Sequence, residues 1–482
     1  SFEGYNIIEA PITKLTRESL KDSGLDGKSI GRSKNMFALG IVYWMFNRPM
    51  EQTEKFLKKK FAKKPEVVAA NIKVMHDGYN FANTIEALPS SYTVLSANLK
   101  DGTYRNVMGN QALAWGLLAA AERANKELFL GSYPITPASD ILHELAKHKN
   151  LGVKTFQAED EIAGICSAIG ASFAGSLAIT TTSGPGLSLK GEGLGLAIMA
   201  ELPLVLVNVQ RGGPSTGLPT KTEQSDLMQA LYGRNGESPA VVLASSTPAN
   251  CFDWAYMAAK ITLEHNTPVV LLSDGHLGNG AEPWKIKSTM DMPEINPNVD
   301  TEKGEYQPYL RDEKTLARKL ALPGTKGKEH RLGGLEKEDV TGNVSYEPEN
   351  HEIMCEIRAE KIQRISDLIP HQEIKGEKEG DLLVIGWGGT YGPLYSAVEN
   401  LLKEDFMVGL CQFNYINPLP KNTADILKNY KKIVVCELNS GQFANYLRMN
   451  FQGTIFSQYN KLQGFPFTTS ELEDHFKTLL SK

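Results

Sequence analysis

Short apolar runs that alternate with helical segments limit the fold of this chain more than any other feature. Leu177–Thr181 (LAITT) and Leu202–Val209 (LPLVLVNV) are short and mostly apolar, which predicts buried strands. Strands that are apolar along their whole length need cover on both faces, and helical connections join parallel strands. We therefore expect an α/β fold with a doubly wound parallel sheet. Its expected strands are 127–131, 153–157, 177–181, 202–209, 240–244 and 269–272, and its expected helices are 137–148, 162–173, 187–199 and 250–264.

The alternation stops after residue 276 and resumes at residue 381. The segment between is rich in proline, glycine and charge, and it contains one expected helix at 353–365, so we interpret it as a long connector. Strands at 381–385, 408–412 and 432–437, with helices at 393–403 and 423–428, predict a second, smaller α/β domain. The first 90 residues look helical, and 87–100 read as a linker. The expected parts are therefore residues 1–90, a linker at 91–104, a large domain at 105–290, the connector at 291–380 and a C-terminal domain at 381–482.

Charge and apolar content argue against several classes of protein. The 482 residues carry a net charge of -5 without a basic stripe, which argues against nucleic-acid binding. The longest apolar run near the start, Met36–Phe46, is too short to span a bilayer and reads as a buried helix. The five cysteines form no C-x-x-C pair, and the histidines form no H-x-x-x-H or H-E-x-x-H pattern. We therefore expect thiols in the core, no metal site on this chain and a cytoplasmic location.

Polar or glycine-rich clusters follow four of the expected strands. In an open α/β sheet, ligands bind beyond the carboxyl ends of the strands, so this placement favours a binding site. The clusters are Tyr133–Pro137 (YPITP), Gln157–Glu161 (QAEDE), Thr181–Gly186 (TTSGPG) and Gln210–Thr220 (QRGGPSTGLPT).

Thr136 and Glu161 are the candidates in the first two clusters. Two prolines stiffen the turn around Thr136 and present its hydroxyl, although capping of the following helix also explains a threonine there. Glu161 is one of three acids at a helix start, where acids often serve only the helix dipole. The helix body contains Ala, Gly, Ile and Cys, so we expect the helix to be buried and Glu161 with it. A buried carboxylate is a candidate for function.

Arg211 is the candidate in the fourth cluster. An arginine fork suits bidentate recognition of a carboxylate, but arginines at strand ends are also often structural. Thr181–Gly186 lacks the G-x-G-x-x-G spacing and a P-loop lysine, so it is weak as a nucleotide motif and is also explained as a tight turn. Gly386–Thr390 (GWGGT) could hold an anion at a helix start or be a tight turn. His276 reads as a turn histidine.

Taken together, the clusters resemble the alpha subunit of the 2-oxoacid:ferredoxin oxidoreductase family. The motifs YPITP, Glu159–Glu161, Thr182–Gly186 and QRGGPSTGLPT occur in that family's order, and the resemblance is strong over 105–290. Residues 381–480 resemble the family's transketolase C-terminal-type domain. Residues 1–90, with Asn35–Gly40 (NMFALG), resemble the end of its gamma domain. Because a complete gamma domain would extend further upstream, we expect a partial, fused gamma-type domain.

The resemblance implies that residues 105–290 form a pyrimidine-binding domain for thiamine diphosphate. Glu161 would match the glutamate that hydrogen-bonds the aminopyrimidine and so promotes loss of the proton from the thiazolium carbon. Pro134 would contact the cofactor, and Thr136 would lie beside the bound 2-oxoacid. Arg211 would hold the 1-carboxylate of the substrate.

The loop after Arg211 is expected to complete the substrate site. Thr216 and Thr220 are plausible neighbours of the substrate, and Lys221 could reach a distal carboxylate. The loop and the fused N-terminal segment resemble the 2-oxoglutarate branch of the family. The expected reaction is therefore the oxidative decarboxylation of 2-oxoglutarate with coenzyme A to succinyl-CoA and carbon dioxide, with reduction of ferredoxin, or its reverse for carbon dioxide fixation.

Two features of the family are missing from this chain. No G-D-G…N motif for diphosphate and magnesium is found, because Ser273 precedes Asp274-Gly275, and no cysteine cluster occurs. The resemblance therefore implies a beta subunit that supplies the diphosphate half, Mg²⁺ and a [4Fe–4S] cluster, in an (αβ)₂ assembly that passes electrons to ferredoxin. The chain should be inactive alone.

Three alternatives stay open. The same chemistry could act on pyruvate or branched-chain 2-oxoacids. The chain could instead be a non-catalytic docking or regulatory subunit of a thiamine enzyme. A dinucleotide-binding dehydrogenase is disfavoured, because the Rossmann fingerprint is missing.

Overall fold

The chain forms two units, Ser1–Asp101 and Gly102–Lys482. The computed structural model describes residue 4 and residues 7–86, 92–302 and 304–481, so part of the expected linker, residues 87–91, lies outside the described residues. The first unit is helical. Its helices are α1 (Ile12–Ser19), α2 (Gly27–Arg32), α3 (Lys34–Met45), α4 (Glu51–Lys60) and α5 (Pro65–Thr84).

Helices α3 and α5 pack closely because both carry a glycine at their contact. A Cβ on Gly40 would lie 2.0 Å from the Met75 carbonyl oxygen, and one on Gly78 would lie 2.1 Å from the Phe37 carbonyl oxygen. Met36–Phe46 is helical as expected, but the expected burial is wrong: within the described unit, α3 buries only Phe37 and Gly40. None of the helices in the described residues is long and apolar enough to cross a membrane.

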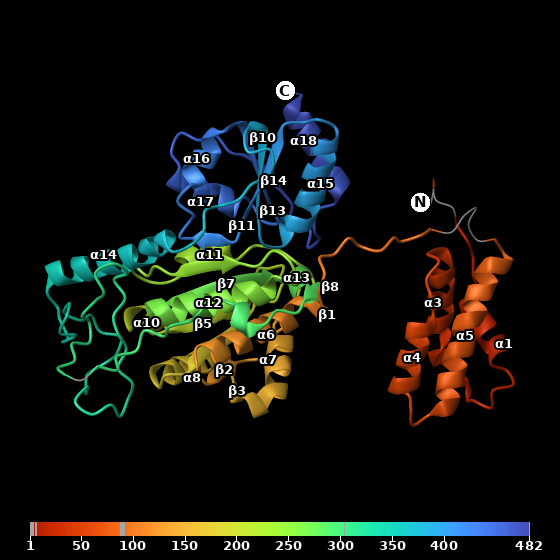
Figure 1. Cartoon of the computed structure of the whole chain (residues 1–482), viewed down its shortest axis with the longest axis horizontal. Coiled ribbons are helices and arrows are strands. Elements are labelled where there is room, and N and C mark those ends of the chain that lie inside the picture. Colours follow the sequence, from red (N-terminus) through yellow and green to blue (C-terminus); the bar gives the residue numbers. More distant parts are fainter. Residues whose placement is uncertain (1–3, 5–6, 87–91, 303, 482) are drawn as a thin grey trace. The chain divides into compact units, whose positions relative to one another are not determined.

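The second unit contains the expected parallel sheet. In its described residues the larger sheet has seven strands in the order β12-β6-β7-β5-β4-β2-β3, and all are parallel except β12. Strands β7, β5, β2 and β3 follow one another in that order in Figure 1. The doubly wound α/β fold is confirmed. The strands are β2 (Leu128–Ser132), β3 (Val153–Gln157), β4 (Leu177–Thr182), β5 (Leu204–Gln210), β6 (Val241–Ala244), β7 (Pro268–Asp274) and β12 (Tyr415–Asn417).

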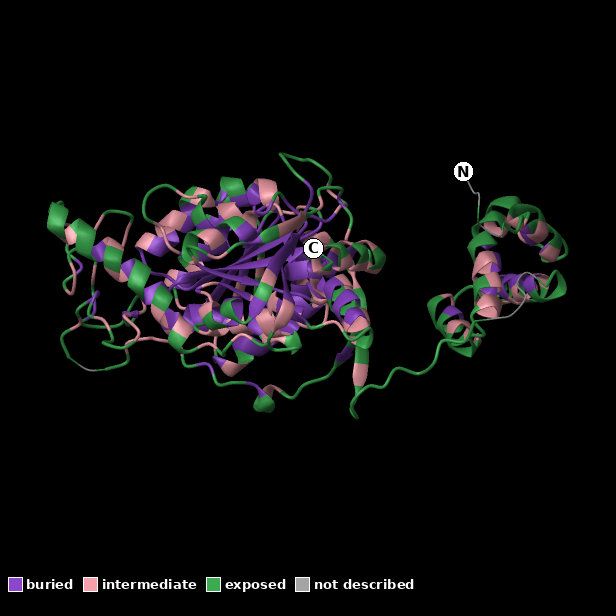
Figure 2. Ribbon diagram, turned by 90° about the horizontal axis from the view of Figure 1, so that it is seen from above, coloured by how far each residue is buried: buried purple, intermediate pink, exposed green. Residues whose placement is uncertain are grey.

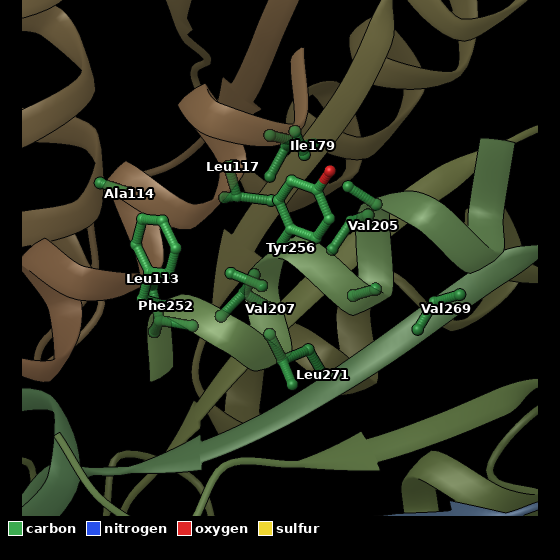
Figure 3. Packing of buried hydrophobic residues seen from close by; sticks show 14 of the residues in the cluster. Leu113, Ala114, Leu117, Ile179, Val205, Val207, Phe252, Tyr256, Val269 and Leu271 are labelled. Atoms are coloured by element: carbon green, nitrogen blue, oxygen red, sulfur yellow. The ribbon is translucent and has the colours of Figure 1, made fainter. Parts of the chain in front are cut away.

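Alternate residues of each central strand enter two different cores. Val205 and Val207 of β5 pack on one face with Leu117 of α6 and Tyr256 of α12 (Figure 3). Leu206 packs on the opposite face with α8 and α10. The strands are therefore buried on both sides, as the apolar runs predict, and the covering helices keep exposed outer faces (Figure 2). The covering helices are α6 (Gly109–Arg123), α7 (Ser139–Leu145), α8 (Glu161–Phe173), α9 (Gly184–Leu189), α10 (Gly191–Met199), α11 (Leu227–Tyr232) and α12 (Cys251–His265).

Several elements differ from the sequence-based expectation. The helix expected at 187–199 is two helices, α9 and α10, which meet at Lys190. The helix expected from Pro137 begins at Ser139. Helix α6 was not predicted. The antiparallel pair β1 (Tyr104–Met108) and β8 (Ala281–Lys285) was not predicted either. Strand β8 follows the short helix α13 (Gly275–Asn279).

The C-terminal part folds around a second, smaller sheet, as expected. Its described strands run in the order β14-β13-β10-β11-β9, and β9 alone is antiparallel to its neighbour. The strands are β9 (Lys375–Gly376), β10 (Gly380–Trp387), β11 (Val408–Phe413), β13 (Tyr430–Glu437) and β14 (Ser457–Asn460). The helices are α15 (Tyr391–Lys403), α16 (Thr423–Lys428), α17 (Gln442–Asn450) and α18 (Thr469–Leu480).

The two sheets of the second unit are joined by a strand and by a buried glutamine. Strand β12 leaves the C-terminal part and pairs with β6 of the larger sheet. Gln224 is fully buried; its amide nitrogen donates to the Trp387 carbonyl at 2.7 Å, and its amide oxygen accepts the Leu438 N–H at 2.9 Å. The Asn439 side chain donates back to the Gln224 carbonyl at 2.8 Å. These bonds hold the C-terminal part against the edge of the sheet that carries the predicted clusters.

The connector is held to the large domain by buried ions. Glu201, which is 1% exposed, accepts from Arg311 at 2.5 Å and from Lys361 at 2.5 Å. Arg318 donates to the Ala200 carbonyl at 2.8 Å. Lys361 lies on α14 (Pro348–Arg364), the helix expected at 353–365. The ion cluster therefore holds the connector, which has little regular structure outside α14, to the large domain.

Candidate active site

The three acids at the start of α8 have three different environments. Glu159 is exposed. The Asp160 carboxylate caps the helix, because it accepts the Ala163 N–H at 2.7 Å. Glu161, the first residue of α8, is 7% exposed. The expected burial of Glu161 is therefore confirmed, and Asp160 rather than Glu161 has the capping role.

Glu161 packs against the turn of the third cluster. A Cβ on Gly186 would lie 1.9 Å from Thr182 Oγ1 and 2.8 Å from Glu161 Cγ. Only a glycine fits at that point, so the TTSGPG segment brings the end of β4 against the start of α8. Gly186 makes this close approach possible.

A buried lysine lies directly beneath this contact. Lys190, at the junction of α9 and α10, is fully buried and donates to the Glu161 carbonyl at 2.9 Å and to Thr180 Oγ1 at 3.0 Å. Burial lowers the pKa of Lys190 to about 8, although nearby Glu161, Asp160 and Cys166 raise it. Lys190 thus connects β4, α8 and the helix junction below Glu161.

Arg211 and Thr136 are brought together by the end of β5. Arg211 is 6% exposed, and its Nη1 donates to the Thr136 carbonyl at 2.6 Å. The Arg211 Nε is buried without a partner among the described residues. Thr136 is exposed, and α7 is preceded by Ala138, so the alternative that Thr136 caps this helix is wrong. Pro134, in the same turn, is half-buried.

Other buried polar atoms lie near the ends of β4 and β5. Asn208 donates to the Asp226 carboxylate at 2.9 Å, and a Cβ on Gly184 would lie 3.0 Å from that carboxylate. Burial raises the pKa of Asp226, with Glu223 adding to the effect and Asn208 opposing it. Within the described part of the chain, Ser183 Oγ and Asn208 Oδ1 are buried without a partner.

The loop after Arg211 closes on itself and contacts the C-terminal part. Gly212 and Leu218 form an antiparallel bridge, and the Gly212 N–H donates to the Lys221 carbonyl at 3.0 Å. The Thr216 and Thr220 side chains are exposed at the loop surface. The Lys221 ammonium lies 4.1 Å from the centre of the Phe465 ring.

The remaining sequence candidates have structural explanations. Asp274 is buried and caps α13, accepting the His276 N–H at 2.8 Å, while His276 itself is exposed. Gly386–Thr390 packs against this position, since a Cβ on Gly389 would lie 2.3 Å from Asp274 Oδ2. The glycine turn thus serves the contact between the two sheets.

Lys190, Asn208 and Asp226 were missed by the sequence analysis. Lys190 is the only one with a sequence signal, because it is a lysine within the segment 184–199, whose other residues are small or apolar except Glu192. Asn208 and Asp226 have no comparable signal, since their burial depends on contacts between distant segments.

Both units match known families. Residues 120–348 match the model described as pyruvate flavodoxin/ferredoxin oxidoreductase, thiamine diphosphate-binding. Residues 3–81 match the pyruvate ferredoxin/flavodoxin oxidoreductase model. The 2-oxoglutarate oxidoreductase subunit KorA of Mycobacterium tuberculosis is 47% identical over 478 residues, which cover 99% of this chain and 73% of that protein. The chain belongs to the 2-oxoacid:ferredoxin oxidoreductase family.

Further members of the 2-oxoacid:ferredoxin oxidoreductase family support this placement. The 2-oxoglutarate synthase subunit KorA of Archaeoglobus fulgidus is 34% identical over 341 residues, covering 70% of this chain and 88% of that protein. The solved 2-oxoglutarate:ferredoxin oxidoreductase of Magnetococcus marinus, with 2-oxoglutarate, coenzyme A and succinyl-CoA bound, has a TM-score of 0.88 and 33% identity. That match covers 96% of this chain and 80% of the other. The chain is thus one subunit of an oxidoreductase.

The residues around Glu161 fit thiamine diphosphate. A polar ring with an amino group needs donors and acceptors in a mostly apolar site, because buried polar groups must be satisfied. Ser183 Oγ, Asn208 Oδ1 and Arg211 Nε are buried polar atoms that keep hydrogen-bonding capacity in the described structure. Glu161 is also buried, and its side chain packs against Gly186, where a Cβ would not fit.

Proposed function

We propose that this chain supplies the pyrimidine half of the active site of a 2-oxoacid:ferredoxin oxidoreductase. The observation that carries this proposal is the buried Glu161 side chain at the start of α8, which packs against Gly186 and whose backbone carbonyl accepts from Lys190. Bound thiamine diphosphate supplies the carbon nucleophile and the electron sink for decarboxylation. Glu161 hydrogen-bonds its aminopyrimidine, and Pro134 contacts the same cofactor.

The substrate we propose is 2-oxoglutarate. The relatives from Mycobacterium tuberculosis and Archaeoglobus fulgidus are both named for 2-oxoglutarate, and the Magnetococcus marinus enzyme binds it. Arg211 holds the 1-carboxylate through N–H groups, such as Nε–H, that are not used in its bond to the Thr136 carbonyl. Lys221 attracts the distal carboxylate from the edge of the loop, and Thr136, Thr216 and Thr220 line the approach.

The reaction cleaves the bond between the carboxylate and the oxo carbon and forms a thioester with coenzyme A. Carbon dioxide and succinyl-CoA leave, the coenzyme A thiol loses its proton, and a pair of electrons passes to ferredoxin. This chain contributes binding and orientation of the 2-oxoacid and proton transfer at the aminopyrimidine. The iron–sulfur cluster and the Mg²⁺ that holds the diphosphate belong to the partner.

A beta subunit completes the site in this proposal, in an (αβ)₂ assembly. Apolar side chains remain exposed at the carboxyl edge of the sheet, around the start of α8: Tyr133 is 39%, Phe156 46%, Ile162 52% and Leu189 52% exposed. Exposed apolar side chains that gather beside a candidate site favour an interface with another protein. The complex would operate in the cytoplasm.

The same proposal assigns the parts of the chain. Residues 1–90 form a gamma-type domain, joined by the linker at 91–104, and residues 105–290 form the pyrimidine-binding domain. Residues 291–380 are the connector, and residues 381–482 are the transketolase C-terminal-type domain. The two-unit division at Asp101 and the family match over 120–348 are compatible with this assignment.

Reconstitution with the beta subunit tests the proposal. The isolated chain should be colourless and inactive, and the complex should reduce ferredoxin only with thiamine diphosphate, coenzyme A and a 2-oxoacid. We expect the largest kcat/KM for 2-oxoglutarate in a panel with pyruvate and branched-chain 2-oxoacids. Preference for pyruvate would transfer the chain to another branch of the family. A complex that binds thiamine diphosphate but turns over no 2-oxoacid would support a docking or regulatory subunit.

A further inference from the structure

Three side chains with different metal-binding atoms meet where the part of the connector before α14 contacts this helix. Glu336, His351 and Cys355 each offer one ligand atom, and these atoms all lie within 4.8 Å of one another. His351 and Cys355 are one turn apart on the same face of α14, and Glu336 comes from the connector. This cluster has no part in the proposed active site, and sequence spacing did not reveal it because Glu336 lies outside the helix.

The spacing of the ligand atoms suits a tetrahedral ion. His351 Nδ1 lies 2.8 Å from a Glu336 oxygen, and Cys355 Sγ lies 3.8 and 3.9 Å from the two ring nitrogens of His351. Bonds of about 2.0–2.3 Å at tetrahedral angles separate neighbouring N, O and S ligands by about 3.3–3.6 Å. Shifts of about 0.5 Å would therefore admit an ion, and the exposed His351 side chain can make such a shift because it is 63% exposed.

The surroundings supply the charge and the hydrogen bonds that a dication needs. His351 and Cys355 line a cavity of about 180 Å³ whose wall also contains Glu192 and Glu237. Arg358 donates to both Glu336 oxygens at 3.2 and 3.0 Å and to Cys355 Sγ at 3.3 Å. Donors to a ligating carboxylate and thiolate orient metal ligands in many sites. The carboxylates of Glu336, Glu192 and Glu237 outnumber the nearby cations, Arg358 and Lys337, which leaves one negative charge in excess for a cation.

We propose that Glu336, His351 and Cys355 form a binding site for Zn²⁺. A thiolate, an imidazole and a carboxylate are the ligand types that this ion accepts, and water from the adjoining cavity takes the fourth position. The ion joins α14 to the part of the connector that precedes it, where Asn350 already donates to the Lys337 carbonyl at 2.8 Å. Binding releases the Cys355 thiol proton, so it requires a reduced cysteine.

Cobalt substitution on the full chain tests the site. The reduced chain is freed of metal with a chelator and titrated with Co²⁺, because a cobalt–thiolate bond gives a near-ultraviolet charge-transfer band. We expect one Co²⁺ per chain, displaced by Zn²⁺. The band should vanish in Cys355→Ser, and Zn²⁺ affinity should fall at least about tenfold in Cys355→Ser and in His351→Gln. Cys166→Ser and His143→Gln, which change exposed residues elsewhere, should match the wild-type chain.

Thermal unfolding provides a second readout. Zn²⁺ should raise the melting temperature of the wild-type chain and of Cys166→Ser but not that of His351→Gln, because an ion that binds only the folded state stabilises it. The proposal is overturned if the wild-type chain shows no saturable cobalt band, or if the band survives Cys355→Ser. In that case the cluster is an ion-pair network closed by Arg358.

Discussion

Arg211 combines a fixed position with unused hydrogen-bonding capacity. One bond to the Thr136 carbonyl, at 2.6 Å, holds the guanidinium at the end of β5, and Nε is buried without a partner among the described residues. Burial lowers the pKa of Arg211, and the nearby Asp226 opposes this shift. A second negative charge nearby would therefore be favourable. A substrate carboxylate meets this requirement.

Replacement of Arg211 should affect every 2-oxoacid alike. A charge-assisted hydrogen bond contributes about 1.5–3 kcal/mol, so Arg211→Ala should lower kcat/KM at least about tenfold for both 2-oxoglutarate and 2-oxobutyrate. Arg211→Lys should restore only part of this loss, because an ammonium lacks the planar fork. Steady-state kinetics of the reconstituted complex measure the effect, with the exposed Arg331→Ala as the control. A loss confined to 2-oxoglutarate would indicate that Arg211 binds the distal carboxylate instead. A fall in melting temperature without a kinetic effect would indicate a structural role.

Lys190 should make the unfolding free energy of the chain depend on pH. Its pKa is about 8 in the folded chain and about 10.5 when unfolded. Between these values the unfolded chain binds a proton that the folded chain does not, so this residue makes the folded state relatively more stable as pH rises. The difference in unfolding free energy between wild type and Lys190→Met should therefore grow in favour of the wild type from pH 8 to pH 10.

Urea unfolding at several pH values measures this difference. Lys154→Met, which removes an exposed lysine of β3, should show no such trend. A pH-independent difference for Lys190→Met would mean that its ammonium is not desolvated. Because Lys190 donates to the Glu161 carbonyl, we also expect a lower kcat in the assembled complex with little change in KM.

Individual site residues differ in how far the sequence could predict them. Glu161 could be chosen among three adjacent acids, because it adjoins an apolar, small-residue helix that must be buried. Arg211 and Thr136 were candidates separately, but their direct bond joins residues 75 positions apart. The capping role of Asp160, the burial of Lys190 and the packing of Lys221 on Phe465 depend on tertiary contacts that local patterns do not contain.

At the scale of elements, the connector depends on the Glu201 ion cluster. Although burial alone raises the pKa of Glu201, Lys361 and Arg311 outweigh it and hold that pKa well below its usual range. Glu201→Gln would leave the buried Lys361 without its acidic partner and Arg311 with only Asp339, 3.6 Å away. We expect it to destabilise the second unit by about 3–5 kcal/mol, measured by urea unfolding. Glu302→Gln, which breaks the exposed pair with Lys319, should change stability by less than about 1 kcal/mol.

A double variant separates the charge effect from a general loss of packing. Glu201→Gln combined with Lys361→Met removes one acid and one base, so it should recover part of the stability lost in Glu201→Gln. If the two substitutions were simply additive, the ion cluster would not hold the connector.

The contact between the two sheets should be equally sensitive at Gln224. Gln224→Leu leaves the buried Leu438 N–H without an acceptor, which costs about 1–3 kcal/mol. Hydrogen exchange should then accelerate in peptides that contain Leu438 but not in those of β4 and β5. Gln229→Leu removes a bond from an exposed amide to Ser188 and is the matched control. Unchanged protection at Leu438 in Gln224→Leu would contradict this role.

The elements themselves were predictable to the extent that they carry an apolar pattern. Strand β4 was located within a residue, since it is a short run buried on both faces. The edge strand β3 was located equally well, although most of its residues are exposed. Helix α6, rich in Ala and Gly, lacks a clear amphipathic period and was missed. Strand β12 is only three residues long and leaves its own domain to pair with β6, which a local pattern cannot indicate.

At the scale of the whole molecule, this chain carries one half of the proposed active site. The second unit places Glu161, Gly186, Lys190 and Arg211 near the carboxyl ends of β4 and β5, beside exposed apolar side chains. The chain lacks a G-D-G…N motif for the diphosphate. The site is therefore expected to work only when a partner covers this edge, and the contribution of this chain should be visible in a step that precedes substrate binding.

Hydrogen–deuterium exchange at the thiazolium C2 position of thiamine diphosphate, measured by NMR in the reconstituted complex, tests the central claim most directly. Glu161→Gln keeps the shape of the side chain but cannot transfer a proton to or from the aminopyrimidine, so C2 exchange should slow by at least about a hundredfold while the complex still assembles. Glu159→Gln, an exposed acid two residues away, should exchange like the wild type. Wild-type exchange in Glu161→Gln, or an equal loss in Glu159→Gln, would contradict the assignment of the half-site to this chain.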